Sequence, residues 1–300
     1  RLNMAKFKIA LCQHDVRDSV SENLRTAAES VRKAARRGAD IAVLPEMFIC
    51  HFVPAQMRFF AQTLSGDVVK ALSKIAEENH IWLVGGSFPE SGGENEQAWG
   101  PEPEIPYGSA PEDGVSSVSS SDAAVLYNTC PVFSPDGALQ GSYRKRFLFD
   151  VDIPGKVRSC ESVVFTPGDR SLIIDTGFVK FGVAICFDIR FPQIFIDMAR
   201  DGADLIVVPA AFSARTGPDH WRLLNRARAL DAQVFVAGAD IAKNEAAPFA
   251  GHGGSCVSDP WGKIIAEAGD GEEIIIAQID TDQVREIRQG LVVLPHQETV

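Results

Sequence analysis

The sequence predicts a single α/β domain, a sandwich of two halves that face each other with helices on the outside. Three observations support this prediction. Stretches with helical periodicity alternate with short apolar stretches along the 300 residues. The stretch GADIAVLP at 38–45 returns as GADLIVVP at 202–209, which indicates two related halves. No segment between the halves has the composition of a domain linker.

The first half contains alternating strands and helices. Residues 6–12 predict a strand, 21–37 an amphipathic helix and 40–44 a buried strand, which together form a βαβ unit. Residues 67–79 predict a second helix, and 81–88 predict the strand that follows it. A chain that alternates in this way favours an α/β fold.

The middle of the chain interrupts the alternation. Residues 91–121 are rich in Gly, Pro, Ser and acidic side chains, so we predict an exposed, mobile insertion that joins two strands. Residues 123–133 and 137–144 predict a hairpin, because the SPDG sequence between these strands suits a tight turn. Residues 146–165 follow neither the helical nor the strand period, so we predict a loop packed over the domain.

The second half repeats the alternation and then changes to antiparallel strands. Residues 179–185 predict a strand buried on both faces, and 192–200 predict the helix after it. Further predicted elements are a strand at 203–209, a helix at 220–231, a strand at 233–239, an antiparallel run at 253–258, 263–267 and 273–279, and a helix at 281–288.

The charge and hydropathy of the chain argue against several classes of function. The formal net charge is −11, and no basic cluster offsets it, which argues against a nucleic-acid or anionic-membrane partner. No apolar run reaches the roughly 18 residues of a membrane span, and the first residues lack the apolar segment of a secretory signal. We therefore expect a cytoplasmic protein that acts on a small molecule.

Six cysteines are scattered without a CxxC pair or a partnering His cluster, so we expect no metal site and reduced thiols. Cys186 ends the apolar strand FGVAI and begins the segment CFDIRFP. A thiol at a strand end can reach the crevice of an α/β sheet, where the next turn can aim backbone N–H groups at an anion. The alternative is an inert buried cysteine, which is common.

Two other polar side chains hold equivalent positions, since Glu46 follows the strand IAVLP and Lys145 follows the second hairpin strand. Amide hydrolysis by a cysteine needs a base for the thiol proton and donors for the tetrahedral oxyanion. Glu46 suits the base. Lys145 and the amide N–H of Phe187 suit the oxyanion, and Glu161 is a candidate second carboxylate.

Each of these side chains also has an ordinary structural alternative. Glu46 can cap the following turn, Lys145 can be a solvated strand end, and Glu161 can be a loop charge. The six histidines show no spacing that supports a local Cys-His pair.

The three strand-end motifs resemble those of the nitrilase superfamily of carbon–nitrogen hydrolases. LPEMF contains Glu46, YRK contains Lys145 and AICFDIRFP contains Cys186, while CES, PGD, TGPDHW and DPWG occur in the family's order. The resemblance implies a four-layer α-β-β-α sandwich with one hydrolase domain at 4–290 and a tail at 291–300. It also implies a Glu-Lys-Cys catalytic set that uses no cofactor.

Within the superfamily, DVDIPGK, FTPGD and FSARTGPDHW resemble the ω-amidase branch most. That branch hydrolyses the terminal amide of α-ketoglutaramate and α-ketosuccinamate. The branch that hydrolyses deaminated glutathione shares a TGPxHW stretch and is the alternative, together with other amidases, nitrile hydrolases and carbamoyl-amide hydrolases. A catalytically silent binding protein is less favoured, because the nucleophile position still holds Cys186.

The resemblance implies that Cys186 attacks the amide carbon and that Glu46 shuttles the proton. Lys145 would hold the oxyanion together with the amide of Phe187, and Glu161 would support the site. The covalent intermediate would be a thioester, which water activated by Glu46 would hydrolyse.

Four further residues concern the substrate. Arg190 or Arg215 is expected to meet the carboxylate of an anionic amide, although Arg190 can equally form a structural ion pair. Phe147 and Phe52 stand where the branch usually has His and Tyr, and each replacement removes a hydrogen-bonding group from the expected pocket. The family's basic C-terminal tail, which helps dimer contacts, differs here, and we expect a homodimer or higher homo-oligomer.

Overall fold

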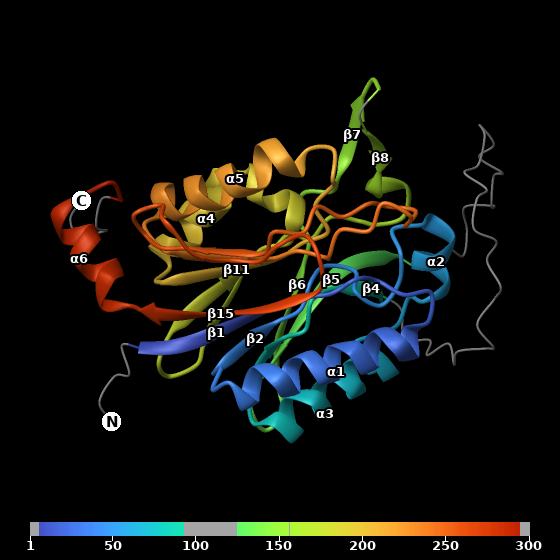
Figure 1. Ribbon diagram of the computed structural model, residues 1–300, viewed down its shortest axis with the longest axis horizontal. Helices are drawn as coiled ribbons and strands as arrows, with labels where there is room; N and C mark the ends of the chain where they lie inside the picture. The colour runs from blue at the N-terminus through green and yellow to red at the C-terminus, as the bar shows by residue number, and fades with distance from the viewer. Residues whose placement is uncertain (1–5, 93–124, 156, 295–300) are drawn as a thin grey trace.

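The computed structural model describes residues 6–92, 125–155 and 157–294 of the chain. These residues form four layers, in the order helix, sheet, sheet and helix (Figure 1). The four-layer α/β sandwich predicted from the sequence is confirmed.

The first sheet has the strand order β15-β1-β2-β3-β5-β4, and β6 pairs with β5. Strands β1, β2 and β3 run parallel, as the predicted βαβ unit requires. Strands β4, β5 and β6 pair in antiparallel fashion. The strands are β1 (Lys6–Gln13), β2 (Ile41–Val43), β3 (Trp82–Val84), β4 (Phe88–Ser91), β5 (Leu126–Phe133), β6 (Leu139–Arg144) and β15 (Glu273–Asp280).

The second sheet has the order β14-β13-β12-β11-β10-β9. Its central strands β10, β11 and β12 run parallel, and the outer pairs are antiparallel. The strands are β9 (Leu172–Asp175), β10 (Lys180–Val183), β11 (Leu205–Pro209), β12 (Phe235–Ala239), β13 (Cys256–Ser258) and β14 (Ile264–Glu267).

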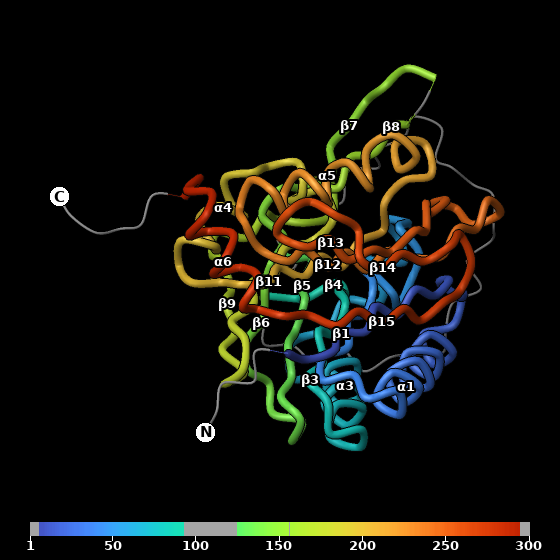
Figure 2. The backbone as a smooth tube through the Cα atoms, turned by 60° about the vertical axis from the view of Figure 1, so that its left-hand side comes forward, coloured from blue at the N-terminus to red at the C-terminus, as the bar shows by residue number. Residues whose placement is uncertain are grey.

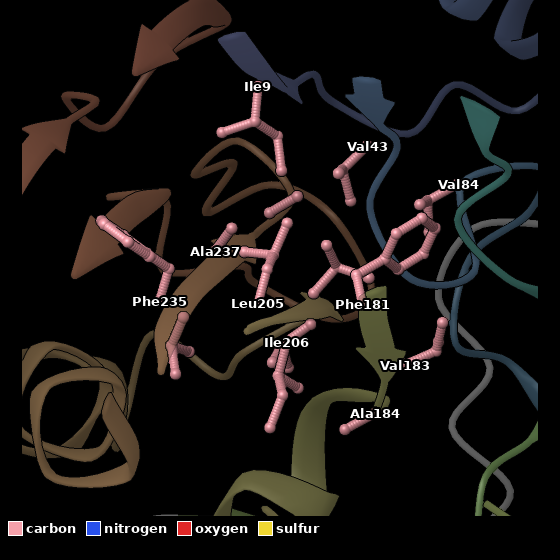
Figure 3. Close-up of a cluster of buried hydrophobic side chains, with 14 of the residues drawn as sticks. Ile9, Val43, Val84, Phe181, Val183, Ala184, Leu205, Ile206, Phe235 and Ala237 are labelled. Carbon is pink, nitrogen blue, oxygen red and sulfur yellow. The ribbon is translucent and has the colours of Figure 1, made fainter. Parts of the chain in front are cut away.

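The main hydrophobic core lies between the two sheets. Ile9, Val43 and Val84 from the first sheet face Phe181 and Leu205 from the second (Figure 3). All five side chains are fully buried, and burial of such a side chain contributes about 2 kcal/mol. This packing fixes the two sheets relative to each other, and with them the strand ends that carry polar residues.

Helices cover the outer faces of both sheets, with α1 and α3 on one side and α4 and α5 on the other (Figure 1). Helix α1 begins where the Ser19 hydroxyl accepts a hydrogen bond from the backbone N–H of Glu22, and its buried stripe includes Val20, Ala27 and Val31. The helices are α1 (Val20–Arg36), α2 (Pro54–Phe59), α3 (Asp67–Asn79), α4 (Pro192–Arg200), α5 (Gly217–Ala232) and α6 (Asp282–Gly290), with 3-10 turns η1 (Glu161–Val163) and η2 (Cys186–Arg190).

The predicted loop at 146–165 is wrong in part. It contains a two-stranded hairpin, β7 (Asp150–Ile153) and β8 (Val157–Cys160), which projects from the domain (Figure 1). Both strands are largely exposed, so neither face needs apolar residues and no alternating pattern marks them. The β7–β8 hairpin therefore does not pack over the domain as predicted.

The predicted antiparallel run near the C-terminus is also wrong in part. After β14 the chain leaves the second sheet, and β15 pairs with β1 of the first sheet, from Lys6↔Asp280 to Gln13↔Glu273 (Figure 2). The pairing covers the free edge of β1, and it buries Ala277 and Ile279. A partner this distant in sequence cannot be read from the strand pattern alone.

Three smaller differences concern strand limits and missed elements. The predicted strand at 81–88 is two strands, β3 and β4, because the chain turns at Gly86, whose φ is +64°. Strand β4 includes Ser91, which pairs with Leu126 and so lies inside the sheet rather than in the predicted insertion. Most of that insertion, residues 93–121, lies outside the described residues. Helix α2 and strand β9 were not predicted from the sequence.

Among the described residues, no helix has both the length and the apolar character needed to cross a bilayer.

Candidate active site

Three polar side chains that follow separate strands meet at one point between the two sheets. The Lys145 ammonium donates to Glu46 Oε1 at 2.8 Å and to Glu161 Oε2 at 2.7 Å. Cys186 lies beside them, and its thiol donates to the carbonyl oxygen of Ala211 at 3.6 Å. The Glu46, Lys145 and Glu161 side chains are at most 1% exposed, so this cluster is sealed from bulk water.

The strand ends explain why these residues converge. Glu46 follows β2 and Lys145 follows β6 in the first sheet, whereas Cys186 begins the η2 turn after β10 in the second. Backbone contacts join the two sheets here, because Ala211 N–H donates to Glu46 Oε2 at 2.8 Å. Glu46 N–H in turn donates to the carbonyl oxygen of Ala210 at 3.3 Å.

Cys186 sits on a constrained turn. Its φ is +42°, a left-handed conformation that side chains rarely adopt and that tight functional turns often require. The Asp188 carboxylate holds this turn, because it accepts hydrogen bonds from Ile185 N–H at 2.8 Å and Phe147 N–H at 2.9 Å. The Tyr143 hydroxyl donates a third, at 2.8 Å. These contacts aim the Cys186 thiol toward the cluster.

Burial and charge set the protonation of the cluster. Burial raises the pKa of Glu46, Lys145 opposes the rise and Glu161 adds to it. Burial alone would lower the pKa of Lys145, but the two carboxylates raise it above its ordinary value. Burial and the Glu46 carboxylate raise the pKa of Cys186 well above its ordinary value. These shifts keep the thiol protonated and Lys145 charged, and they increase the proton affinity of the Glu46 carboxylate.

Asn128 on β5 completes the cluster, and sequence reasoning missed it. Its Nδ2 donates to Glu46 Oε1 and to Glu161 Oε1, each at 2.9 Å, so one amide bridges the two carboxylates. Its backbone carbonyl accepts from Lys145 N–H at 2.8 Å. The signal that could have found it is an amide side chain inside the largely apolar strand LYNTCPVF, because a buried amide needs hydrogen-bond partners.

A cavity of about 210 Å³ opens beside the thiol. Arg190 lines it half-buried, and its guanidinium carbon lies 5.6 Å from the Phe187 ring centre and 5.2 Å from that of Phe212. His220 Nδ1 lies 3.3 Å from both terminal nitrogens of Arg190, and no carboxylate among the described residues pairs with it. Thr216 also lines the cavity, with a buried hydroxyl that has no hydrogen-bond partner there.

A second cavity of about 300 Å³ lies on the Glu46 side. Phe52 lines it, and its ring centre lies 5.4 Å from that of Phe249. The two cavities share one lining residue, Ala211. The lining of the second cavity consists of Asp15, Val16, Glu46, Met47, Cys50, His51, Phe52, Ala211, Ile241, Ala242, Asn244, Ala247 and Phe249.

Two predicted substrate residues lie elsewhere. Phe147 lines neither of these cavities and stacks on Phe191, with ring centres 3.6 Å apart and planes 10° apart. The Arg215 side chain is exposed and also lines neither, so its position gives no support to the predicted carboxylate contact. Arg190, by contrast, lines the same cavity as Cys186, and within residues 6–92, 125–155 and 157–294 it has no acidic partner of the kind that a structural ion pair needs.

Comparison with known proteins identifies the family to which the chain belongs. The carbon–nitrogen hydrolase family model matches residues 8–289. Omega-amidase NIT2-A of Xenopus laevis is 40% identical over 288 residues, which cover 96% of this chain and 94% of that protein. Omega-amidase NIT2 of Homo sapiens is 38% identical with the same coverage.

Solved structures agree with these relatives. Saccharomyces cerevisiae Nit3, a member of branch 10 of the nitrilase superfamily, superposes with a TM-score of 0.80 at 34% identity, over 98% of this chain and 97% of that one. The NitFhit protein of C. elegans has the same TM-score at 27% identity, over 98% of this chain and 65% of that chain. The membership predicted from the three motifs is therefore confirmed, and the chain belongs to the carbon–nitrogen hydrolase family of the nitrilase superfamily.

Proposed function

We propose that the protein is an ω-amidase that hydrolyses the terminal amide of small dicarboxylic acid monoamides such as α-ketoglutaramate and α-ketosuccinamate. One observation carries the proposal: the cavity lined by Cys186, next to the carboxylate–lysine cluster, is also lined by Arg190, whose guanidinium pairs with no carboxylate in the part of the chain that the structure describes. A short amide with an acid at its far end satisfies both groups. The relatives named ω-amidases support the same reaction.

In the first half-reaction, Cys186 Sγ attacks the amide carbon while its proton passes to Glu46. The developing oxyanion accepts hydrogen bonds from the Lys145 ammonium and from the backbone N–H of Phe187. Glu46 then gives its proton to the leaving nitrogen, the C–N bond breaks, and ammonia departs from a thioester on Cys186. Lys145 is a donor rather than a base here, because the two carboxylates favour its charged form.

In the second half-reaction, water takes the place of ammonia. Glu46 accepts a proton from the water as its oxygen attacks the thioester carbon, and the same donors hold the second oxyanion. Collapse breaks the C–S bond, frees the dicarboxylic acid and returns the proton to the thiol. Glu161 and Asn128 act as positioning residues in both halves, because they hold Glu46 and Lys145 rather than the reacting carbon.

Arg190 recognises the acid end of the substrate in this proposal. A guanidinium can bind a carboxylate through two parallel hydrogen bonds, and the Phe187 and Phe212 rings lie 5.6 and 5.2 Å from the guanidinium carbon of Arg190. The unpartnered Thr216 hydroxyl offers a further donor to the same carboxylate.

The Cys186→Ala variant tests the nucleophile. Ammonia release from α-ketoglutaramate should fall by at least about 10⁴-fold, because no acyl-enzyme can form. Mass spectrometry of the rapidly quenched wild-type enzyme should find an acyl adduct on Cys186. Normal turnover by the alanine variant would exclude this mechanism.

A substrate panel tests the specificity. The panel contains α-ketoglutaramate, deaminated glutathione, a carbamoyl-amine and a nitrile, and the proposal expects the highest kcat/KM for α-ketoglutaramate. A higher value for deaminated glutathione would favour the alternative branch instead, and comparable rates on all four would defeat the ω-amidase assignment.

The predicted homodimer or higher homo-oligomer and the predicted cytoplasmic location stay predictions. Light scattering of the purified protein checks the first, and microscopy of a tagged copy in its source cells checks the second.

A further inference from the structure

A buried carboxyl group directly after β12 has no role in the reaction described above. It belongs to Asp240, which is fully buried. We propose that Asp240 is a positioning residue for Cys186, because it holds one peptide group with its carbonyl oxygen toward the thiol. This inference rests on the proposed function for the role of Cys186 as the nucleophile.

The peptide group that Asp240 holds joins Ala211 to Phe212, shortly after β11. Its N–H, on Phe212, donates to Asp240 Oδ1 at 2.7 Å, and its carbonyl oxygen, on Ala211, accepts from the Cys186 thiol at 3.6 Å. The N–H and the carbonyl of a trans peptide point in opposite directions, and the described residues contain no cis peptide. The contact with Asp240 on one side therefore fixes the direction of the oxygen on the other.

Ala211 connects the nucleophile to the base of the proposed mechanism. Its N–H donates to Glu46 Oε2 at 2.8 Å, whereas its carbonyl oxygen accepts from Cys186. The thiol must point in a defined direction to pass its proton to the carboxylate and to attack the amide carbon. A rotation of the Ala211–Phe212 peptide would therefore disturb the nucleophile without any change in Glu46 or Lys145.

Asp240 is itself held by its neighbours. Its Oδ1 also accepts from Ile241 N–H at 2.9 Å, and its backbone N–H donates to Ser255 Oγ at 2.9 Å. The Ser255 hydroxyl in turn donates to Gln13 Oε1 at 2.8 Å, which links this network to β1 of the first sheet. These contacts restrict the movement of the carboxyl group, so it gives the peptide a rigid support.

The second carboxyl oxygen of Asp240, Oδ2, is buried and has no hydrogen-bond partner among the described residues. Burial raises the pKa of Asp240 well above its ordinary value, and the Glu46 carboxylate adds to this rise, although the backbone hydrogen bonds oppose it. The neutral acid is therefore favoured, with its proton on Oδ2, because Oδ1 accepts from two N–H groups. The support of the peptide thus needs the Oδ1 acceptor and no charge.

Loss of this acceptor should change the thiol in a defined way. A buried N–H without a partner is costly, so the peptide should turn its N–H toward another acceptor. The Ala211 oxygen then moves away from Cys186, and the negative end of the peptide dipole no longer disfavours the thiolate. The thiolate should form at lower pH, while the misdirected sulfur attacks the amide carbon more slowly.

Alkylation of Cys186 by iodoacetamide over a pH series tests this inference, with the Cys186 peptide followed by mass spectrometry. Asp240→Leu keeps the approximate shape of the side chain without an acceptor, and it should lower the midpoint of the alkylation profile by about one pH unit. Its kcat for α-ketoglutaramate should fall by about tenfold, with KM changed less than about twofold. Asp240→Ala is a second variant without an acceptor, so a folding failure of one leaves the other.

Two controls assign the effect to the hydrogen bond. An ionised Asp240 would itself raise the pKa of Cys186, and Asp240→Asn removes that charge but keeps an oxygen that accepts from Phe212 N–H. We expect this variant to keep the wild-type midpoint and kcat. Glu90→Gln controls for general destabilisation, because Glu90 is buried against Arg144 and makes no contact with Cys186, and it should also keep the wild-type midpoint.

Three outcomes would overturn the inference. The first is an unchanged midpoint in Asp240→Leu and Asp240→Ala. The second is an equal fall in Asp240→Asn, which would assign the effect to charge, and the third is an equal fall in Glu90→Gln, which would assign it to general loosening. Alkylation needs no amide turnover, so the result is independent of the substrate. Failure of the wild-type enzyme to release ammonia from α-ketoglutaramate would overturn the proposed function instead.

Discussion

Two clusters of carboxylate and cation lie back to back on opposite faces of β5 and β6. Asn128 and Thr129 are consecutive on β5, and Arg144 and Lys145 are consecutive at the end of β6, so each pair sends one side chain to either face. Thr129 and Arg144 bind Glu90 on one face. Asn128 and Lys145 bind the active-site carboxylates on the other.

The Glu90 cluster is balanced in charge. Arg144 grips the carboxylate with two nitrogens, at 2.9 and 2.5 Å, and Thr129 Oγ1 adds a hydrogen bond at 2.6 Å. The guanidinium lies over the Tyr127 ring at 3.7 Å and remains 38% exposed, so part of its charge stays hydrated. The Glu90 charge is neutralised by one cation and its oxygens accept hydrogen bonds, so we interpret this cluster as a structural link between β4, β5 and β6.

The active-site cluster is unbalanced. Two carboxylates, Glu46 and Glu161, share the single ammonium of Lys145, and none of the three is more than 1% exposed. A buried cluster with an excess negative charge has a high affinity for a proton, and in the proposed mechanism the Cys186 thiol next to it supplies that proton. Excess buried charge, rather than the ion pairs themselves, distinguishes the face proposed to be reactive from the structural one.

The largest effect is expected when the excess carboxylate is neutralised. Glu46→Gln should lower kcat by about 10³-fold, because the thiol proton loses its acceptor. The melting temperature should also fall, because the glutamine Nε2 must face either the Ala211 N–H or the Lys145 and Asn128 donors, and an amide nitrogen cannot accept a hydrogen bond. Ammonia-release kinetics and thermal unfolding check both parts.

A kcat close to the wild-type value in Glu46→Gln would contradict the comparison. It would mean that the Glu46 charge serves only the fold, as the Glu90 charge does.

Asn128→Ala should have the next largest effect. It removes the donor that bridges the two carboxylates, so kcat should fall by about 10²-fold while KM changes less than about twofold, because Asn128 does not touch substrate. Thr129→Val is the matched control on the opposite face and should retain kcat. A change confined to KM in Asn128→Ala would assign Asn128 to substrate binding instead.

The sequence predicted Glu46 and Cys186 as strand ends because each stands at the end of an apolar run. Lys145 follows the mostly polar strand LQGSYR, and the resemblance of the three motifs supplied the reason to group it with the other two. Their convergence could not be derived from the pattern, since it depends on how two sheets pack.

The role of Asn128 could not be predicted from the alternation of strand residues. A strand alternates its faces, but the sequence does not say that both faces of β5 carry polar clusters, so an amide between Tyr127 and Thr129 looks ordinary. The β7–β8 hairpin and the pairing of β15 with β1 were missed for a related reason: solvent on both faces erases alternation, and the choice of partner strand is non-local.

Glu90→Gln, unlike Glu46→Gln, should lower the stability without lowering kcat, and its effect should be smaller in free energy than either of the two changes above. The unfolding free energy should fall by about 2 kcal/mol, because charge-assisted hydrogen bonds from Arg144 are lost at a buried position. The value of kcat should stay within about twofold of wild type, as the reactive face is untouched. Urea unfolding measures the first quantity and steady-state kinetics the second. A loss of kcat comparable to that of Asn128→Ala would show that the two faces are coupled.

The smallest expected effect is a shift in the pH profile of activity, which distinguishes the role of Glu161 from that of Glu46. Glu46 must be ionised to accept the thiol proton, so activity falls as pH drops through its pKa, which burial and Glu161 hold above the ordinary value. Glu161→Gln removes the like charge that disfavours ionised Glu46, and the pKa of Glu46 should therefore fall. The acid limb of the kcat/KM profile should move to lower pH, whatever the loss in the maximal rate. Glu90→Gln should leave the limb in place, and a shift to higher pH in Glu161→Gln would mean that loss of hydrogen bonds, rather than loss of repulsion, dominates at Glu46.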